Sequence, residues 1–256
     1  MRMLLPVPVD HLSDVDVDLA YAWPGDPEPL PWLRANMVAT VDGAAGSPDG
    51  RSATISSDAD RRVFGRLRGL ADVVLVGAGT ARTEGYRPAR VRPEHAERRR
   101  AAGQTDVPAI ALVTRSLDLD LGSDLLARST VRTVVVTSAS SDPGRRARVA
   151  EVADLIVAGE DQVDLALAVT ALRERGLRRI HAEGGPRLLG DLAAADLLDE
   201  LLLTVSPLLA GGAYGDDHAV PRILAGARLP RSPRPLRLHH LLEDDGSLFL
   251  SYRTDT

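Results

Sequence analysis

The sequence predicts an α/β fold in which a mainly parallel central sheet lies between two layers of helices. Short apolar segments rich in Val, Leu and Ala alternate along the chain with segments whose apolar residues recur at helical spacing. Such alternation is typical of parallel, three-layer α/β domains. One apolar segment runs directly into a glycine pair that opens a helix, and no internal repeat indicates a solenoid. The expected ligand sites are therefore the ends of the strands.

The individual elements follow from the two periodicities. Helices are predicted where apolar residues share one helical face, at 57–70, at 161–175 and from 186 to about 195. Strands are predicted where β-branched and other apolar residues run together, at 33–40, 72–76, 109–114, 133–137, 177–182, 200–205 and 247–252. The last of these strands is expected at an edge of the sheet.

Residues 1–31 differ in texture from the rest of the chain. They contain six prolines and scattered aspartates, a composition that favours an extended segment over a folded domain. We therefore expect an extended N-terminal arm at 1–31 and a single α/β domain at 32–256.

Composition excludes several classes of function. With 31 basic and 36 acidic residues the net charge is −5, which argues against nucleic acid or an acidic membrane as the partner. No apolar run reaches the roughly 20 residues of a membrane span, and the first residues lack the order of a signal peptide. We expect a cytoplasmic protein.

Missing residue types exclude further chemistry. The chain has no cysteine and no lysine, which removes thiolate and Schiff-base chemistry, Cys-ligated metals and the lysine of P-loop enzymes. Its six histidines show no metal-binding spacing, so no metal is expected. The sequence also lacks the GxSxG elbow of serine hydrolases.

The segment Glu183-Gly184-Gly185-Pro186 is the strongest local signal for a ligand site. Glycines let backbone N–H groups approach a ligand closely, and proline suits the first position of a helix. The positive end of the helix then points at whatever occupies the turn, so this junction is suited to an anion.

Three other strand ends carry polar groups. Thr40-Val41-Asp42-Gly43 leaves the first predicted strand and taken alone is also an ordinary Asp-Gly turn. Gly77-Ala78-Gly79-Thr80 is a glycine-rich turn that fails the GxGxxG fingerprint, because Arg82 occupies the third glycine position. Thr114-Arg115-Ser116 combines a guanidinium with two hydroxyl groups, a set suited to a phosphate monoester.

Taken in order, these segments resemble the pyrimidine reductase family of riboflavin biosynthesis, whose fold is that of dihydrofolate reductase. The resemblance runs from Trp32 to the C-terminus, and the ordered set is more specific than any one member. It rests on Asn36, Thr40-Val41-Asp42-Gly43, Thr54-Ile55-Ser56, Arg68, Gly77-Ala78-Gly79-Thr80 and Glu183-Gly184-Gly185-Pro186.

The resemblance implies NADPH as the cofactor. Its pyrophosphate would lie at the turn formed by Gly184, Gly185, Pro186 and Leu188, and its 2′-phosphate near Thr114, Arg115 and Ser116. Other family positions that contact the dinucleotide match Thr54, Gly77, Gly79 and Thr80. The family's reaction reduces the ribosylamino group of a diaminopyrimidinone ribose phosphate to a ribitylamino group, with the cofactor carrying the hydride.

Substrate and proton-transfer residues are implied in the same way. Asn36, Arg68 and Glu84 match substrate-facing positions, and Arg87 and Arg90 are the candidates for the substrate's 5′-phosphate. Asp42 and Glu183 are the candidates for bonding sugar hydroxyls or assisting proton transfer to the ring oxygen, although Glu183 is equally suited to capping nearby backbone. The later run 97–100, Glu-Arg-Arg-Arg, is predicted to be an exposed helix.

The chain departs from the family pattern at two points. The chain lacks the HxE and PCxxC motifs of the zinc deaminase that many relatives carry, so we expect a stand-alone reductase, and relatives are commonly homodimers. Glu84 stands where many relatives have Asp. Two alternatives therefore stay open: a dihydrofolate or pterin reductase of the same fold, and a protein that binds NADPH without catalysis.

Overall fold

The computed structural model describes residues 1–25, 31–47, 50–211, 220–226, 228–230 and 232–254. The chain forms two compact units, one made of Met1–Ala22, Leu33–Leu67 and Glu183–Thr256 and the other of Trp23–Trp32 and Arg68–Ala182. We call them unit 1 and unit 2. This division does not follow the expected boundary between an arm at 1–31 and a domain at 32–256.

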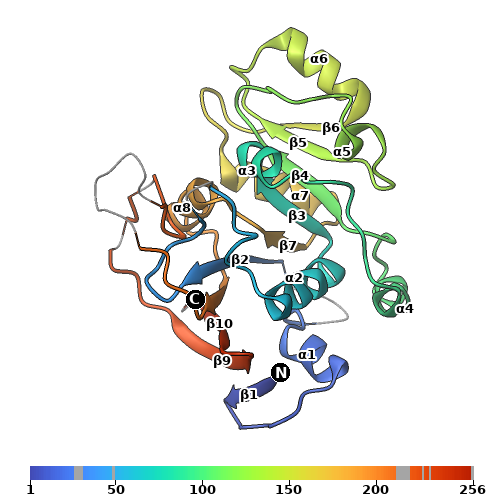
Figure 1. Ribbon diagram of the computed structural model, residues 1–256. Helices are drawn as coiled ribbons and strands as arrows, with labels where there is room; N and C mark the ends of the chain where they lie inside the picture. The colour runs from blue at the N-terminus through green and yellow to red at the C-terminus, as the bar shows by residue number, and fades with distance from the viewer. Residues whose placement is uncertain (26–30, 48–49, 212–219, 227, 231, 255–256) are drawn as a thin grey trace. The chain divides into compact units, whose positions relative to one another are not determined.

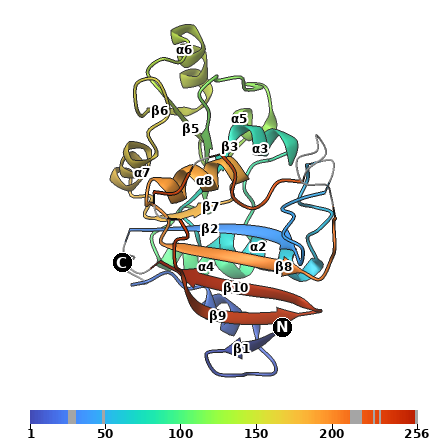
Figure 2. The same cartoon turned by 90° about the vertical axis from the view of Figure 1, so that its left-hand side faces the viewer.

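Among the residues that the structure describes, unit 1 is built on five strands. In sequence order its elements are β1 (Arg2–Leu5), α1 (Asp14–Ala20), β2 (Trp32–Thr40), most of α2 (Asp58–Leu70), α8 (Pro186–Ala194), β8 (Glu200–Ser206), β9 (Arg237–Asp244) and β10 (Ser247–Arg253). The strands lie in the order β1-β9-β10-β8-β2, which Figure 2 shows one beside the next. β2 and β8 are parallel, whereas the pairs formed by β10 with β8 and β9, and by β9 with β1, are antiparallel.

Unit 2 is a parallel α/β unit. Its elements are β3 (Val73–Gly77), α3 (Ala78–Thr83), α4 (Pro93–Ala101), β4 (Ala109–Val113), α5 (Asp124–Ala127), β5 (Val134–Thr137), α6 (Pro143–Val152), β6 (Asp154–Val157), α7 (Leu165–Glu174) and β7 (Arg179–Ala182). The strand order is β7-β3-β4-β5-β6, with all four pairs parallel (Figure 1). The predicted α/β fold with a mainly parallel sheet is confirmed.

The sheet of unit 2 is buried on both faces, as parallel sheets are. Alternate residues of β3, β4 and β5, among them Val74, Leu112 and Val135, pack in one apolar cluster with residues of α3, α5 and α6. The intervening residues, such as Leu75 and Val136, are equally buried. The Val-rich runs are therefore strands because both of their faces are covered by apolar groups.

The expectation of an edge strand at 247–252 was wrong. β10 lies between β8 and β9, and the hairpin that joins β9 to β10 turns at Asp245 and Gly246, whose φ angles are +50° and +75°. Positive φ at both central residues is the signature of the Asp-Gly hairpin turn. The Asp-Gly dipeptide is present in the sequence, but the charged segment before it shows no regular alternation of apolar and polar residues. The partner strand β9 was therefore not predicted.

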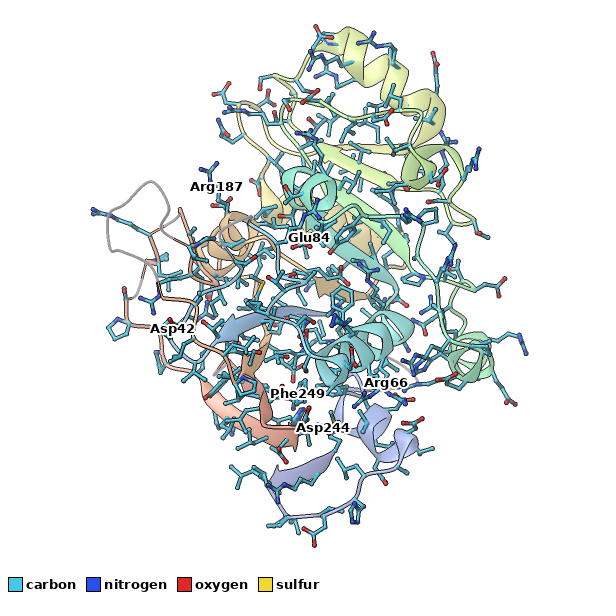
Figure 3. All side chains as sticks on the ribbon, in the orientation of Figure 1. Asp42, Arg66, Glu84, Arg187, Asp244 and Phe249 are labelled. Atoms are coloured by element: carbon cyan, nitrogen blue, oxygen red, sulfur yellow. The ribbon has the colours of Figure 1, made fainter. Side chains whose placement is uncertain are left out.

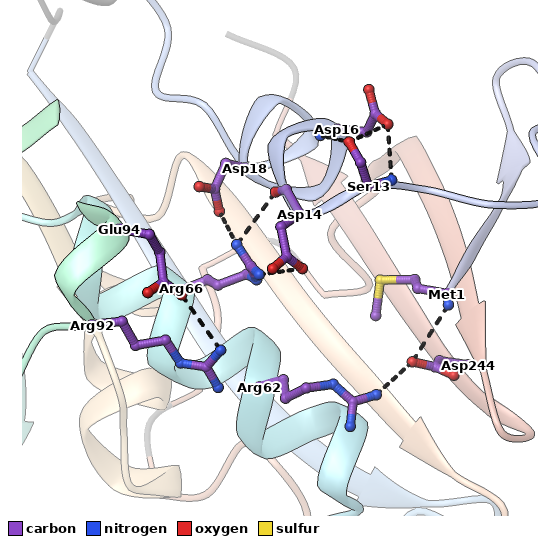
Figure 4. A network of polar contacts seen from close by, with 10 residues as sticks. All are labelled: Met1, Ser13, Asp14, Asp16, Asp18, Arg62, Arg66, Arg92, Glu94 and Asp244. Atoms are coloured by element: carbon purple, nitrogen blue, oxygen red, sulfur yellow. Dashed lines mark hydrogen bonds and ion pairs between the residues drawn. The ribbon is translucent and has the colours of Figure 1, made fainter. Parts of the chain in front are cut away.

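Part of the segment 1–31, which was expected to be an extended arm, forms a strand and a helix. β1 is the edge strand beside β9, and α1 is a helix with a capping box formed by Ser13 and Asp16. The guanidinium of Arg66, only 4% exposed, forms ion pairs with Asp14 and Asp18, which attach α1 to α2 (Figure 4). The prolines suggested extension, but a buried cation distant in sequence holds the helix in place. Residues 26–30 lie outside the described part.

The run Glu97–Arg100 is helical as predicted, but it is not wholly exposed. Arg99 on α4 is buried at 1% exposure, and its guanidinium donates hydrogen bonds to the carbonyl oxygens of Gly69, Ala71 and Thr105 at 2.7–2.9 Å. Two of these carbonyls stand at the C-terminal end of α2, where a cation is favoured. The run of charged residues in the sequence gave no sign that Arg99 is buried.

Two glycines in helices provide a matched pair of stability tests. A Cβ at Gly190 in α8 would lie 2.4 Å from the carbonyl oxygen of Ala225, whereas a Cβ at Gly65 in α2 would meet no atom within 4 Å. We expect Gly65→Ala to stabilise the protein by about 0.5–1 kcal/mol through helix propensity. Gly190→Ala should instead destabilise it by about 1–3 kcal/mol, because backbone must move. Urea unfolding of both variants checks the opposite signs, and equal effects would contradict the close approach at Gly190.

A buried histidine in unit 1 makes stability depend on pH. His240 on β9 is 3% exposed and meets the ring of Tyr21 edge-on, with 5.1 Å between ring centroids. Burial lowers the pKa of His240 to about 4. Because the unfolded histidine has a pKa near 6.5, the unfolded state binds the proton first as the solution is acidified. Above about pH 6.5, His240 is neutral in both states and does not reduce the free energy of unfolding. That free energy falls as the pH is lowered from 6.5 towards 4.

We expect this histidine to remove about 1–3 kcal/mol from the free energy of unfolding across that pH window. His240→Phe keeps an aromatic ring against Tyr21 and should flatten that part of the pH profile. Substitution of the exposed His11 by Gln is the control. Urea midpoints measured through the window check the expectation, and an identical slope in wild type and His240→Phe would contradict it.

No helix in the described ranges is both long and apolar enough to cross a membrane.

Candidate functional site

The expected site residues occur in both units, and each set is described within its own unit. Unit 1 contains Asn36, Asp42, Thr54, Glu183, Gly184, Gly185, Pro186 and Leu188, and unit 2 contains Arg68, Gly77, Gly79, Thr80, Glu84, Arg87, Arg90, Thr114, Arg115 and Ser116. Some of them follow the end of a strand, such as Asp42, Glu183 and Thr114, whereas Asn36 lies within β2 and Arg68 on α2.

The glycine turn before α8 is shaped for close approach of another group. Gly184 is buried and has φ of +76°, and a Cβ there would lie 2.9 Å from the Sδ atom of Met37. Only glycine adopts this conformation without strain. The peptide bond between Gly184 and Gly185 is cis. The sequence predicted a backbone turn with no side chain in the way, and the turn has that form.

Helix α8 begins directly at this turn. Gly185 is its N-cap residue and provides no side-chain cap, and Pro186 is at the first helical position. The first N–H groups of a helix have no partner within the helix, so they and the positive end of the dipole suit a phosphate group. Leu188 is buried and anchors the first turn of the helix. These residues fit a dinucleotide pyrophosphate.

Arg187 lies on the exposed side of the same first turn, where Figure 3 labels it. It is the one basic side chain in the sequence Gly-Gly-Pro-Arg, and its charge acts on Asp191 one turn later. Arg187 was not among the site residues predicted from the sequence. Its place directly after the glycine pair and Pro186 is the sequence feature that could have indicated it.

The Asp42 carboxylate belongs to a hydrogen-bonded turn after β2 (Figure 3). It accepts hydrogen bonds from the Thr40 hydroxyl and from the backbone N–H groups of Ala210, at 3.2 Å, and Gly211, at 2.7 Å. The Thr40 hydroxyl and these N–H groups lower the pKa of Asp42 to about 2. At neutral pH the group is therefore an ionised acceptor that holds the segment after β8 against the turn after β2.

The other candidates in unit 1 differ in exposure. Glu183 is buried at 7% exposure at the start of the glycine turn. Asn36 is half-buried on β2 beside Leu202 of β8, and it points to the opposite face of the strand from its neighbour Met37. Thr54 is exposed in the loop before α2, with its hydroxyl 3.4 Å from the carbonyl oxygen of Arg51.

Two neighbouring strand ends in unit 2 bring the other cofactor candidates together. Gly77, at the end of β3, pairs with Val113, at the end of β4, so the segments 77–80 and 114–116 leave the sheet side by side. The glycine-rich segment is not an open turn, because α3 begins at Ala78 with Gly77 as its N-cap. Gly79 is exposed and Thr80 is half-buried.

The segment 114–116 combines one buried residue with two exposed ones. Thr114 is 8% exposed, and its hydroxyl accepts a hydrogen bond from the N–H of Leu117 at 3.1 Å. Arg115 and Ser116 are exposed. The carbonyl oxygen of Ser116 accepts a hydrogen bond from the guanidinium of Arg145 on α6 at 2.9 Å. Thr114 thus shapes the loop, while the two exposed residues present a guanidinium and a hydroxyl group.

The expected substrate residues of unit 2 follow α3. The guanidinium of Arg68 lies over the ring of Tyr86, 5.0 Å from its centroid, which orients a cation by its contact with the aromatic face. Glu84 is the C-cap residue of α3 and is half-buried. Arg87 and Arg90 are exposed and have no ion pair within the described part of the chain, so both guanidinium groups are available to an anion.

The family of the protein follows from comparison with known families. The family model of the RibD C-terminal domain matches residues 31–222. The chain belongs to the RibD C-terminal domain family. The match contains every expected site residue and all the elements from β2 to β8, which is the part of the chain where the sequence motifs are found.

Relatives within the RibD C-terminal domain family cover most of the chain. It is 29% identical over 182 residues to the 2,5-diamino-6-ribosylamino-4(3H)-pyrimidinone 5′-phosphate reductase of Archaeoglobus fulgidus, a match of 71% of this chain and 83% of that protein. The reductase of the same name from Methanothermobacter thermautotrophicus is also 29% identical, over 71% of this chain and 80% of that protein. The crystal structure of a pyrimidine reductase-like protein from Corynebacterium diphtheriae is 25% identical, with a TM-score of 0.82 over 94% of this chain and 98% of that one.

Proposed function

We propose that the protein is an NADPH-dependent reductase of riboflavin biosynthesis, with 32–256 as its reductase domain. Its substrate is 2,5-diamino-6-ribosylamino-4(3H)-pyrimidinone 5′-phosphate, whose ribosylamino group it reduces to a ribitylamino group. Two archaeal relatives that match this chain over more than two thirds of its length carry the name of that reductase. The glycine turn before α8, which fits a dinucleotide, is the structural observation that carries the proposal.

In unit 1, the residues of the glycine turn before α8 would hold the pyrophosphate of the cofactor. Nicotinamide, when bound, supplies the hydride for the reduction. The N–H groups of the first turn of α8 would hold the pyrophosphate. Gly184 allows the turn to form, because its φ is +76° and a Cβ there would meet the Sδ atom of Met37. Burial of Leu188 keeps this turn from moving away from the bound group. The role of the chain at this point is therefore positioning.

Hydride transfer to the sugar's C1 would break the bond between C1 and the ring oxygen, and that oxygen would take a proton from solvent water. Asp42 does not supply it at neutral pH, because its pKa of about 2 keeps it ionised. We assign to Asp42 the role of a hydrogen-bond acceptor that orders the strand ends, and to Glu183 the hydrogen bond to a sugar hydroxyl. In unit 2, Arg87 and Arg90 bind the 5′-phosphate, which guanidinium groups recognise with two parallel bonds.

The test is NADPH oxidation by the purified protein, followed by absorbance with the diaminopyrimidinone ribose phosphate and with dihydrofolate in parallel. We expect turnover of the ribose phosphate alone, with a product that has gained two hydrogens by mass spectrometry. Turnover of dihydrofolate without dependence on a ribose phosphate would support the pterin reductase alternative. NADPH binding without turnover of either would support a non-catalytic protein. The names of the reported relatives favour the first outcome.

A further inference from the structure

The loop of residues 50–57 leads into α2 and contains no helix or strand. The carbonyl oxygen of Ser52 accepts hydrogen bonds from the N–H groups of Ile55 and Ser56, at 3.0 and 3.1 Å. Ile55 is 5% exposed, whereas Thr54 beside it is exposed. The backbone bonds fix the local shape of the loop, so its place on the sheet of unit 1 depends on side chains.

A buried carboxylate joins this loop to the sheet. Asp60 lies in the first turn of α2 and is 5% exposed. Its Oδ2 atom accepts a hydrogen bond from the Ser56 hydroxyl, and its Oδ1 atom accepts one from the Thr204 hydroxyl on β8 at 2.6 Å. One oxygen therefore binds the loop and the other binds the strand, and the carboxylate is the link between them.

The partners of this carboxylate are hydroxyl groups of the described residues rather than a guanidinium group. The N–H of Asp60 in turn donates to the Ser57 hydroxyl at 3.1 Å, and the N-terminal turn of a helix favours a negative charge. A buried carboxylate lowers stability unless it is hydrogen-bonded, and an apolar side chain would fill the same space without this penalty. What Asp60 binds, rather than how it packs, therefore explains an acidic residue at this position.

Thr204 lies on the sheet face that also carries the substrate candidate Asn36. In the parallel pair of β2 and β8, Thr204 is opposite Val38 and Leu202 is opposite Asn36. Residues that are opposite in this register point to the same face, as do residues two apart along a strand. The bond from Asp60 to Thr204 therefore attaches the loop to the face on which Asn36 lies.

We propose that Asp60 is a positioning residue of the reductase site, because its carboxylate fixes the loop 50–57, and with it the exposed Thr54, against β8. This role rests on the proposed function, under which Thr54 contacts the dinucleotide. Both oxygens of Asp60 bind the protein, so Asp60 acts through the loop and not on the ligand itself. A loop without this link samples more conformations, and a dinucleotide that orders it again binds more weakly.

Ser56→Ala and Asp60→Asn test the link from its two ends. Ser56→Ala removes the bond to the loop but keeps the bond between Asp60 and Thr204, so the start of α2 stays attached to β8. Asp60→Asn keeps the shape of the side chain and leaves one neutral acceptor oxygen in place of two charged ones. We expect each variant to raise the Kd and the KM of NADPH about three- to thirtyfold, with kcat changed by less than about twofold.

Hydrogen exchange followed by mass spectrometry reports on the loop without a ligand. The amide groups of residues 50–57 should exchange faster in both variants, because the loop opens more often. Asp58→Asn is the matched control: it removes an acidic group from the same helical turn, where the Asp58 side chain is 89% exposed. We expect it to change neither the exchange of the loop nor the affinity for NADPH.

A double-mutant cycle separates the link from a direct contact of Ser56 with the ligand. When Ser56 acts through Asp60, the variant with both substitutions loses no more NADPH affinity than the more affected single variant. Additive losses would overturn the assignment of Asp60.

Two other results would overturn the assignment as well. One is unchanged exchange of the loop, and the other is faster exchange with unchanged NADPH affinity, which would leave Asp60 a structural role alone. In each of these cases the wild type binds and oxidises NADPH, so the proposed function stands. A wild type that binds no dinucleotide would instead overturn the proposed function together with the role of Asp60.

Discussion

Gly185→Val is expected to weaken NADPH binding by about 100- to 1,000-fold, or about 3–4 kcal/mol. Gly185 is the buried N-cap residue of α8, so a branched side chain there fills the space in front of the first N–H groups of the helix. Its φ of −70° and ψ of −164° are extended, a conformation that valine adopts readily. We therefore expect the loss to appear in cofactor affinity, measured by calorimetry or by quenching of tryptophan fluorescence.

Gly185→Ala provides a graded comparison and should lose less affinity than Gly185→Val. Circular dichroism and thermal unfolding of both variants show whether the fold is retained. The opposite balance is expected at Gly184, where φ of +76° and the contact with Met37 make even alanine destabilising. Unchanged NADPH affinity in a folded Gly185→Val would refute the placement of the pyrophosphate at this turn.

Arg99→Met is expected to destabilise the protein by about 3–5 kcal/mol. The variant keeps an apolar side chain of similar length but leaves the carbonyl oxygens of Gly69, Ala71 and Thr105 without the donor that they share. An unsatisfied buried acceptor costs about 1–3 kcal/mol, and the three losses do not add fully. Burial lowers the pKa of Arg99 to about 10, so the guanidinium is charged at neutral pH and the hydrogen bonds are charge-assisted.

The neighbouring Arg100→Met is the matched control for this variant. Arg100 is exposed on the same helix, and its replacement should change the free energy of unfolding by less than about 0.5 kcal/mol. Urea unfolding of both variants checks the difference. Equal stability of the two would show that Arg99 does not hold the end of α2.

The backbone form of the glycine turn before α8 was more predictable from sequence than the surroundings of Asp42. Position 184 requires glycine, because its φ is positive and a Cβ there would clash with Met37. A glycine pair between a strand and a helix is recognisable within one short segment of sequence. Asp42 was selected from an Asp-Gly turn, but its low pKa depends on N–H groups of Ala210 and Gly211, about 170 residues later in the chain.

Sequence alone was enough to predict the parallel α/β class, the positions of most strands and helices, and the glycine turn that opens α8. These depend on apolar periodicity and on backbone freedom, which are properties of short segments. Three other features emerge only in the folded chain: β1 and not β10 is an edge strand, Arg99 is buried, and the Asp42 carboxylate accepts hydrogen bonds from the segment after β8. Each of those depends on partners far away in the chain, and local patterns carry no information about which distant groups will meet.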